Sequence, residues 1–378
     1  MDFSIGEEQQ EVRDLARRIL EDQVDPARLR QVEASDEGID RRAWDALAGA
    51  NLLGVAIPEE DGGSALGFHA LCALLEEVGR AVAPVPAYAS LVLAALPLGR
   101  FGSREQRRRW LPEIASGRCI LSGALEEEAN PDPTRPRVVA RRDGSAWRLD
   151  GRKILVPAAH LAERILVPAA TGEGRVGLFL VDPRGGGARL ERQRTSDRQP
   201  RFQLDLAGAR AGADDAVGDH EAGADAVRWL AERAAVGLCA LQLGVAERAL
   251  RMTAEYTSSR RQFDRPIGSF QAVHMRAADA FIQVEAMRLT CAEAAWRLDQ
   301  ERPATSQVAV AKYWAAEGGQ FVGYAAQHLH GGIGIDVEYP LHRYYLWAKQ
   351  LELSLGSAPE QLARLGERLA RGPASAEA

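Results

Sequence analysis

The hydrophobic periodicity of this chain changes twice, and that change constrains the possible fold more than any other feature. Up to about residue 118, apolar residues recur every three or four positions, as in Val12–Ile19, which predicts amphipathic helices. From about 119 to 220 the period falls toward two, as in Phe202–Leu206, which predicts short strands. From about 221 the helical spacing returns, as in Leu230–Ala249.

These three blocks predict an α+β protein with three domains. We expect an N-terminal helical domain over 1–118, a small antiparallel β-domain of about six to eight strands over 119–220, and a C-terminal four-helix bundle over 221–378. Within the bundle, one helix should bury an apolar face at four positions: Phe281, Val284, Met287 and Cys291.

Local signals refine these expectations at helix starts and strand turns. Ser4 with Glu7 predicts a capping box, and Ser103 predicts the N-cap of a short charged helix. Asp143-Gly144 and Asp150-Gly151 predict two turns between strands.

Composition excludes several classes of function. The chain has 378 residues, 46% of them hydrophobic and 26% charged, and a net charge of −6, which disfavours a nucleic-acid binder. No run of 18 apolar residues exists and the start resembles no signal peptide, so we expect a cytoplasmic protein without a membrane span. Nearly all of its cations are arginine, which we attribute to a GC-rich bacterial genome.

The four cysteines are far apart in the sequence: Cys72, Cys119, Cys239 and Cys291. They form no C-x-x-C pair and have no zinc-like spacing, so the sequence predicts no metal site. We expect four buried free thiols.

Two segments of the third block carry the most specific information. The first, Tyr256–Gln271, reads YTSSRRQFDRPIGSFQ, and the second, Gln327–Ile335, reads QHLHGGIGI and is followed by Glu338-Tyr-Pro340. On these motifs the sequence resembles the acyl-CoA dehydrogenase family. The segments IPEEDGG (57–63) and WLPEIASG (110–117) and the helix–sheet–helix order extend the resemblance over nearly the whole chain.

The resemblance implies that FAD is bound across a subunit interface. By resemblance, Arg260 contacts the FAD pyrophosphate of a neighbouring subunit, Gln271 bonds its adenosine side, and Gly331 and Gly332 let the backbone approach the cofactor. His328 stands where the family usually has glutamine. Asp264 stands where the family usually has glycine, and we expect it to pair with Arg265.

The catalytic base that the family uses is missing from its usual positions. Removing the α proton of an acyl-CoA thioester needs a carboxylate. The usual base position is Leu355, the alternative position on the long helix is Ala234, and the preceding Arg-Asp pair is Leu346-Trp347. No residue is therefore assigned as catalytic: Glu352 is a weak substitute, and we interpret Glu232 and Glu247 as surface charges.

The β-domain also departs from the family. Members that hold the flavin ring there usually carry Thr-Glu-Pro-x-x-Gly-Ser and Trp-Ile-Thr, whereas this chain has Leu125–Pro133 (LEEEANPDP) and Lys153–Pro157 (KILVP). Leu155 and Pro157 offer no side-chain donor to a flavin ring.

The residues that would reach a neighbour's FAD are thus largely kept, whereas those that would hold a flavin ring within this chain are missing. In this respect the chain resembles the non-catalytic partner subunits of heteromeric bacterial acyl-CoA dehydrogenases of steroid or lipid catabolism. The implied assembly is a heterotetramer that acts on an acyl-CoA thioester. Three alternatives stay open: a self-sufficient dehydrogenase with a displaced base, a flavin-dependent monooxygenase of the same fold, and a flavin-free scaffold subunit.

Overall fold

A computed structural model describes residues 6–220 and 223–372. The chain divides into two compact units. The first, which we call the helical unit, comprises Met1–Gln31, Phe68–Ala83 and Ala235–Ala378. The second, the sheet unit, comprises Val32–Gly67 and Pro84–Ala234. The helices of the first sequence block are thus divided between the two units.

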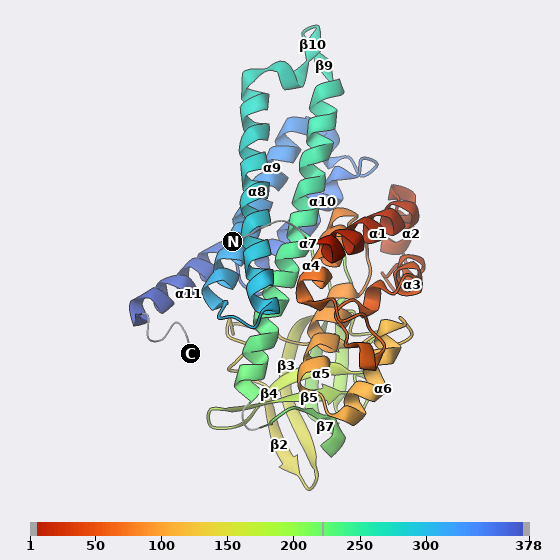
Figure 1. The fold of residues 1–378 in the computed structure, drawn as a ribbon, viewed down its shortest axis with the longest axis vertical. Coiled ribbons are helices and arrows are strands. Elements are labelled where there is room, and N and C mark those ends of the chain that lie inside the picture. Colours follow the sequence, from red (N-terminus) through yellow and green to blue (C-terminus); the bar gives the residue numbers. More distant parts are fainter. Residues whose placement is uncertain (1–5, 221–222, 373–378) are drawn as a thin grey trace. The chain divides into compact units, whose positions relative to one another are not determined.

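The helices are found where the sequence pattern predicts them (Figure 1). They are α1 (Glu7–Gln23), α2 (Pro26–Glu33), α3 (Arg41–Gly49), α4 (Gly67–Arg80), α5 (Leu96–Phe101), α6 (Arg104–Ala115), α7 (Gly223–Ser259), α8 (Gln271–Asp299), α9 (Thr305–His330), α10 (Leu341–Leu353) and α11 (Ala358–Arg371). Short turns of helix are η1 (Leu52–Gly54), η2 (Glu59–Asp61), η3 (Tyr88–Ala95, a π-helix), η4 (Ala213–Asp215), η5 (Ile267–Ser269) and η6 (Gly331–Ile335).

The middle block forms one eight-stranded sheet within the described residues. Its strands are β1 (Ser122–Gly123), β2 (Val139–Asp143), β3 (Ala146–Pro157), β4 (Ile165–Gly172), β5 (Arg175–Val181), β6 (Ala188–Gln193), β7 (Arg201–Ala211) and β8 (Ala216–Val217). The order is β6-β7-β3-β2-β4-β5-β8, with β1 beside β4. Most pairings are antiparallel as predicted, but β1–β4 and β2–β4 are parallel, so the sheet is mixed.

One of the two predicted turns is correct and the other is wrong. Asp143-Gly144 begins the tight turn between β2 and β3, where Gly144 has φ +63°. Asp150-Gly151 lies instead inside β3, at a bulge where Gly151 has φ +136°. A Cβ at Gly151 would come within 3.0 Å of Val138, so the glycine serves close strand packing and not chain reversal.

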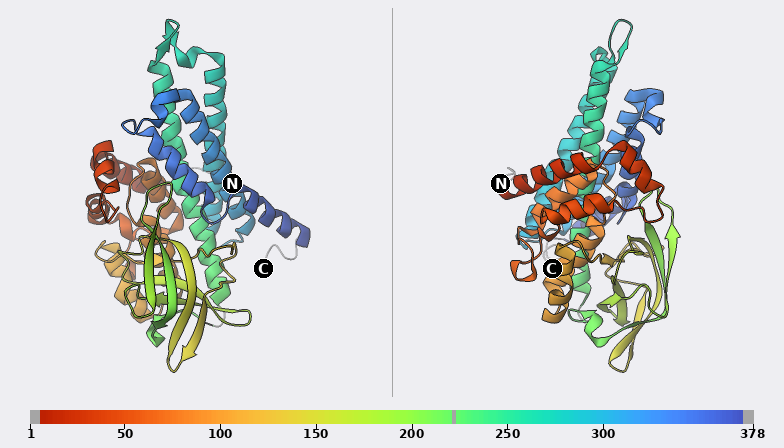
Figure 2. Two further views of the ribbon diagram at one scale, coloured as in Figure 1. Left: turned by 180° about the vertical axis from the view of Figure 1, so that it is seen from behind. Right: turned by 90° about the vertical axis from the view of Figure 1, so that its right-hand side faces the viewer.

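The helical unit is organised around a close crossing of α4 and α7. A Cβ at Gly244 would lie 1.8 Å from the Glu76 carbonyl oxygen, and one at Gly79 would lie 2.0 Å from that of Leu241. Only glycine allows the two backbones to touch in this way. The bundle itself is formed by α7, α8, α9 and α10, and Figure 2 shows it from two further sides.

Several local predictions are confirmed, and others are not. Ser103 caps α6 by accepting a hydrogen bond from Gln106 N at 3.2 Å, and all four cysteines are free and buried. Ser4 lies outside the described residues. Val284, Met287 and Cys291 are buried as expected, but Phe281 is exposed, so the predicted core face of α8 is wrong at that residue.

In the described part of the chain, α7 alone is long and apolar enough to cross a membrane, and 83% of its apolar window is buried inside the protein. This burial is typical of a core helix. Among the same residues, no group of three metal-binding side chains is found.

Candidate functional site

The first motif forms a hairpin at one end of the bundle, between α7 and α8 (Figure 1). Its strands are β9 (Arg261–Gln262) and β10 (Arg265–Pro266), joined by a two-residue turn at Phe263-Asp264. Both turn residues have positive φ, +53° and +62°, as a type I′ turn requires. Phe263 is 86% exposed at the tip. A bulky side chain in this conformation is strained, which marks the turn as a candidate functional feature.

Arg260 lies at the base of this hairpin. Its backbone N–H donates to Tyr256 O at 2.8 Å, and its carbonyl accepts from Ile267 N at 2.8 Å, so the backbone is fixed while the side chain is exposed. Gln271, the first residue of α8, is also exposed.

The expected pairing of Asp264 with Arg265 is wrong. The guanidinium of Arg265 lies over the ring of Phe270, 4.1 Å from its centroid, and Arg261 donates to the backbone carbonyl of Asp264. The Arg265 guanidinium therefore makes a cation–π contact with Phe270 in place of an ion pair with the Asp264 carboxylate.

The second motif lies toward the same end of the bundle (Figures 1 and 2). Aromatic stacking joins it to the first motif. Tyr256, on the last turns of α7, stacks on His330, with ring centroids 4.5 Å apart. His330 in turn contacts the Tyr339 hydroxyl through Nε2 at 3.1 Å, and Nδ1 contacts Ala326 O at 2.8 Å. Burial lowers the pKa of His330, so the ring is neutral and structural at pH 7.

The remaining predicted contacts of this motif lie on the surface. His328 is exposed, and Gly331 and Gly332 have open space beside their Cα atoms. Gly331 has φ +64°, which a side chain would strain. We call the residues 256–271 and 327–340 the bundle tip. It holds Arg260, Gln271, His328, Gly331 and Gly332 together with the exposed Phe263, Ile333, Ile335 and Val337.

The predicted base position lies in a rigid loop between α10 and α11. Leu355 has φ +54° and its carbonyl accepts from Gln361 Nε2 at 3.1 Å. The buried Lys312 fixes the end of α10 by donating to the carbonyls of Leu351 and Glu352 at 3.1 and 3.0 Å. An apolar side chain at Leu355 cannot accept a proton, whatever its position.

Neither the substitute base nor the alternative base position offers a free carboxylate. Glu352 accepts from Lys349 Nζ at 2.7 Å and from Gln320 Nε2 at 3.3 Å, so its carboxylate already has two donors from this chain. Ala234 is fully buried, and Glu232 is half-buried on the same helix.

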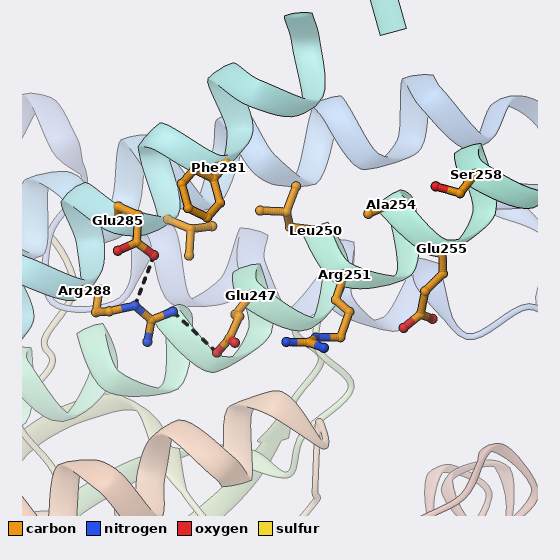
Figure 3. Close-up of a pocket in the computed structure, with 10 residues that line it drawn as sticks. Glu247, Leu250, Arg251, Ala254, Glu255, Ser258, Phe281, Glu285 and Arg288 are labelled. Carbon is orange, nitrogen blue, oxygen red and sulfur yellow. Dashed lines mark hydrogen bonds and ion pairs between the residues drawn. The ribbon is translucent and has the colours of Figure 1, made fainter. Parts of the chain in front are cut away.

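Glu247 is not the surface charge that we predicted. It lies 3.6 Å from Arg288 and 3.7 Å from Arg80, at one end of a groove of about 660 Å³ between α7 and α8 (Figure 3). Arg288 also pairs with Glu285 at 3.2 Å and Glu76 at 3.4 Å. Burial raises the pKa of Glu76, and the charges of its arginine partners partly offset this effect.

In the sheet unit, the two segments that would face a flavin ring lie side by side. Ile154 N donates to Glu126 O at 3.0 Å, and Lys153 Nζ lies 2.7 Å from Glu127 Oε1. Both members of this ion pair are buried. The Glu127 carboxylate also accepts from Arg137 N at 2.7 Å, Val138 N at 3.1 Å and Asn130 Nδ2 at 2.8 Å.

The protonation of this pair follows from its burial and its partners. Burial raises the pKa of Glu127, but Lys153 and the hydrogen-bond donors outweigh it, so the net shift is downward. Burial lowers the pKa of Lys153, and Glu127 opposes that shift. The carboxylate is therefore internally satisfied and offers nothing to a ligand.

Family models support the resemblance directly. Residues 6–118 match the model of the acyl-CoA dehydrogenase N-terminal domain, and residues 221–370 match that of the acyl-CoA dehydrogenase C-terminal domain. The chain belongs to the acyl-CoA dehydrogenase family.

Similar members of this family include chains from two-protein complexes. The acyl-CoA dehydrogenase FadE27 of Mycobacterium tuberculosis is 40% identical over 99% of this chain and 100% of its own length. A chain of the ChsE4-ChsE5 complex of the same organism is 40% identical with a TM-score of 0.93, covering 99% of this chain and 100% of its own. A chain of the Tcur3481-Tcur3483 steroid acyl-CoA dehydrogenase is 45% identical with a TM-score of 0.92, covering 98% and 100%.

A more distant relative has been solved with the cofactor. PigA with FAD and proline is 25% identical, with a TM-score of 0.89, and covers 98% of this chain and 100% of its own. FAD is thus bound by members of this family.

Sequence reasoning missed three features of the site. They are the Tyr256–His330–Tyr339 stack, the Glu127–Lys153 pair and the arginine partners of Glu247. Each joins residues distant in sequence, and the available signal was a lysine, Lys153, directly before the apolar run Ile154–Val156.

Proposed function

We propose that this chain is the non-catalytic subunit of a heteromeric acyl-CoA dehydrogenase and that it completes the FAD site of a neighbouring subunit. The reaction is the FAD-dependent α,β-dehydrogenation of an acyl-CoA thioester. One observation carries the proposal: the base position holds Leu355, while the side chain of Arg260 is exposed at the bundle tip.

The two parts of a FAD site fit this chain differently. The guanidinium of Arg260 has forked donors that suit a pyrophosphate, and the backbone at Gly331-Gly332 is open to approach. We infer that these residues, with Gln271 and His328, would hold the nucleotide part of a neighbour's FAD. When bound, FAD supplies the acceptor for the β hydride.

The segments of this chain's own sheet unit do not fit a flavin ring. Leu155 and Pro157 lack side-chain donors, and the Glu127 carboxylate is occupied by Lys153 and three further donors. A flavin ring needs hydrogen-bond donors near its reactive edge. We therefore assign the ring, and the thioester beside it, to the neighbouring subunit.

The similarity to the Tcur3481-Tcur3483 steroid acyl-CoA dehydrogenase supports a thioester with a large acyl group, such as a steroid side chain. A heterotetramer in the cytoplasm of a bacterium is the setting that fits this assignment. Leaving half of the sites without a flavin makes more room for a bulky acyl group at the others.

The test is to purify the chain alone and together with the acyl-CoA dehydrogenase-like chain encoded beside its gene. Alone, we expect a colourless protein that does not oxidise acyl-CoA. Together, we expect a yellow complex whose flavin absorbance is bleached by a steroid-side-chain acyl-CoA.

Other outcomes would contradict the proposal in recognisable ways. A yellow protein that oxidises thioesters without a partner would indicate a self-sufficient dehydrogenase. Oxygen consumption with reduced flavin and no bleaching by acyl-CoA would indicate a monooxygenase. A complex that binds flavin equally well after substitution of Arg260 would indicate that this chain is a scaffold subunit.

A further inference from the structure

The sheet has an open cleft where two of its neighbouring strands stop pairing. β2 pairs with β3 along its whole length, Val139–Asp143, but with β4 at a single residue pair, Val139 with Ala170. Beyond that pair a cleft of about 590 Å³ lies between the ends of β2 and β4. All of its lining residues belong to the sheet unit, and the proposed function uses none of them.

The backbone of Arg142 faces this cleft without a strand partner. Hydrogen-bonded and non-hydrogen-bonded residue pairs alternate along an antiparallel hairpin. Asp143 and Ala146 flank the two-residue turn as a hydrogen-bonded pair, so Arg142 and Trp147 form a non-hydrogen-bonded pair. The N–H and C=O groups of Arg142 therefore point away from β3, toward the side where pairing with β4 has ended. This edge offers a main-chain donor and acceptor to an added strand.

The side chains that line the cleft are positively charged. Three of them are arginines, Arg141, Arg142 and Arg175, and none of the described residues that line the cleft is acidic. Arg141 is partly neutralised from outside the lining, because it lies 3.1 Å from Asp150. The lining itself carries only positive charge, which favours an anionic occupant.

The guanidinium of Arg142 is held in place by neutral groups. It lies over the ring of Trp147, 4.4 Å from the centroid, and its Nη2 donates to Nε2 of His220 at 2.9 Å. His220 packs edge-on against Trp147, and its carbonyl accepts from Thr171 Oγ1 at 2.9 Å. Because only a neutral imidazole nitrogen can accept from arginine, these contacts orient the guanidinium and leave its charge uncompensated.

The guanidinium of Arg175 is given room by a glycine directly across the β4–β5 hairpin. A Cβ at Gly172 would lie 2.6 Å from Nη2 of Arg175 and 2.8 Å from its Nε. The missing side chain thus lets the guanidinium lie against β4 beside the cleft. Charges that only protect a strand edge from aggregation need to be exposed and nothing more. Two arginines held in place instead suit forked hydrogen bonds to carboxylates.

We propose that this cleft binds an extended acidic segment of a partner protein, which adds a strand beside β2 and pairs its carboxylates with Arg142 and Arg175. In this mode of recognition, main-chain hydrogen bonds give affinity and side-chain contacts give specificity. Opposite charges directly across two strands stabilise their pairing. A small anion such as pyrophosphate would use the arginines but not the backbone edge, so the unpaired backbone of Arg142 favours a peptide.

The test uses the acetylated and amidated peptide EVEVEV, labelled with a fluorophore and titrated with the purified chain at low salt. We expect saturable binding that weakens about 10- to 100-fold in Arg142→Ala and in Arg175→Ala, the worth of a charge-assisted hydrogen bond. Gly172→Ala should weaken it less, because the Arg175 guanidinium can move aside. Arg189→Ala, an exposed arginine on β6 beyond β7 and β3, is the matched control and should bind as the wild type does.

Charge reversal separates lost recognition from misfolding. The double variant Arg142→Glu/Arg175→Glu should bind the peptide KVKVKV more tightly than EVEVEV, the reverse of the wild-type preference. A new preference of this kind requires a folded cleft. A wild-type chain that does not bind EVEVEV, or a double variant that still prefers it, would overturn the proposal.

Hydrogen exchange tests the added strand itself. At a peptide concentration ten times the dissociation constant, exchange of the Arg142 amide should slow about 10-fold. Binding without this protection, or tighter binding of pyrophosphate than of EVEVEV, would indicate a small-anion site and overturn the proposal. The result is independent of the proposed function, because it involves neither FAD nor the bundle tip.

Discussion

The bundle tip and the paired segments of the sheet unit use their charged groups in opposite ways. At the tip, Arg260 extends from a fixed backbone into solvent. In the sheet unit, Glu127 and Lys153 are buried and form an ion pair, and the Glu127 carboxylate also accepts from backbone donors. One region therefore exposes a cation that an external anion could reach, while the charges of the other belong to the protein core. A subunit that supports a neighbour's cofactor needs only the first.

The strongest test of this comparison is to break the buried pair. Lys153→Met leaves the Glu127 carboxylate buried without its cation, which should lower the free energy of unfolding by about 3–5 kcal/mol. Denaturant unfolding followed by circular dichroism measures the change. The double variant Glu127→Gln/Lys153→Met should recover most of the loss.

A matched control lies one residue away. Arg152 pairs with Asp205 at 2.6 Å on the surface, so Arg152→Ala should cost less than about 1 kcal/mol. Equal losses in the two variants would show that the buried pair has no special structural role.

The next test concerns the tip. Arg260→Ala, co-purified with the partner chain, should weaken FAD binding by about 10- to 100-fold, the worth of a charge-assisted hydrogen bond. The melting temperature of this chain alone should not change, because the side chain is exposed. Arg251→Ala, an exposed arginine two to three turns earlier on α7, is the control and should keep the flavin.

The pH dependence of stability gives a further test of the buried pair. The pKa of Glu127 is lowered in the folded protein, so its contribution to stability is present above its ordinary pKa of 4.5 and is lost as pH falls through the lower folded value. Below pH 4.5 the wild-type chain should therefore lose more stability than the double variant Glu127→Gln/Lys153→Met. Parallel losses in urea titrations across pH 3 to 6 would show that Glu127 contributes nothing to acid sensitivity.

The smallest expected effect lies in the hairpin turn. Asp264 has φ +62°, which glycine adopts without strain, so Asp264→Gly should stabilise the hairpin by about 0.5 kcal/mol. It also removes a negative charge from the bundle tip and should raise the affinity of the complex for FAD slightly. Hydrogen exchange of the hairpin amides and a flavin titration measure both effects, and weaker flavin binding would argue against an anion at this site.

The sequence predicted the fold class and the motifs well because periodicity and local motifs are properties of neighbouring residues. Ser103 and the turn at Asp143-Gly144 were found for this reason. Asp150-Gly151 was misassigned because a glycine serves a bulge and a turn equally well. The placement of Arg260, Gln271, His328 and the two glycines on a neighbour's FAD stays a prediction.

The parts that sequence reasoning missed depend on contacts between distant segments. Phe281 has the spacing of a core residue, yet its side chain is exposed because it lines the open groove between α7 and α8. Glu247 was interpreted as a surface charge because its partners, Arg80 and Arg288, come from other helices. No local pattern encodes such long-range ion pairs.

The stoichiometry of flavin in the purified complex tests the central claim most directly. Absorbance of released FAD, compared with protein content by amino-acid analysis, gives the number of flavins per pair of unlike chains. The account predicts one FAD per pair, bound only when the partner is present. Two FAD per pair, or one FAD on this chain alone, would contradict it.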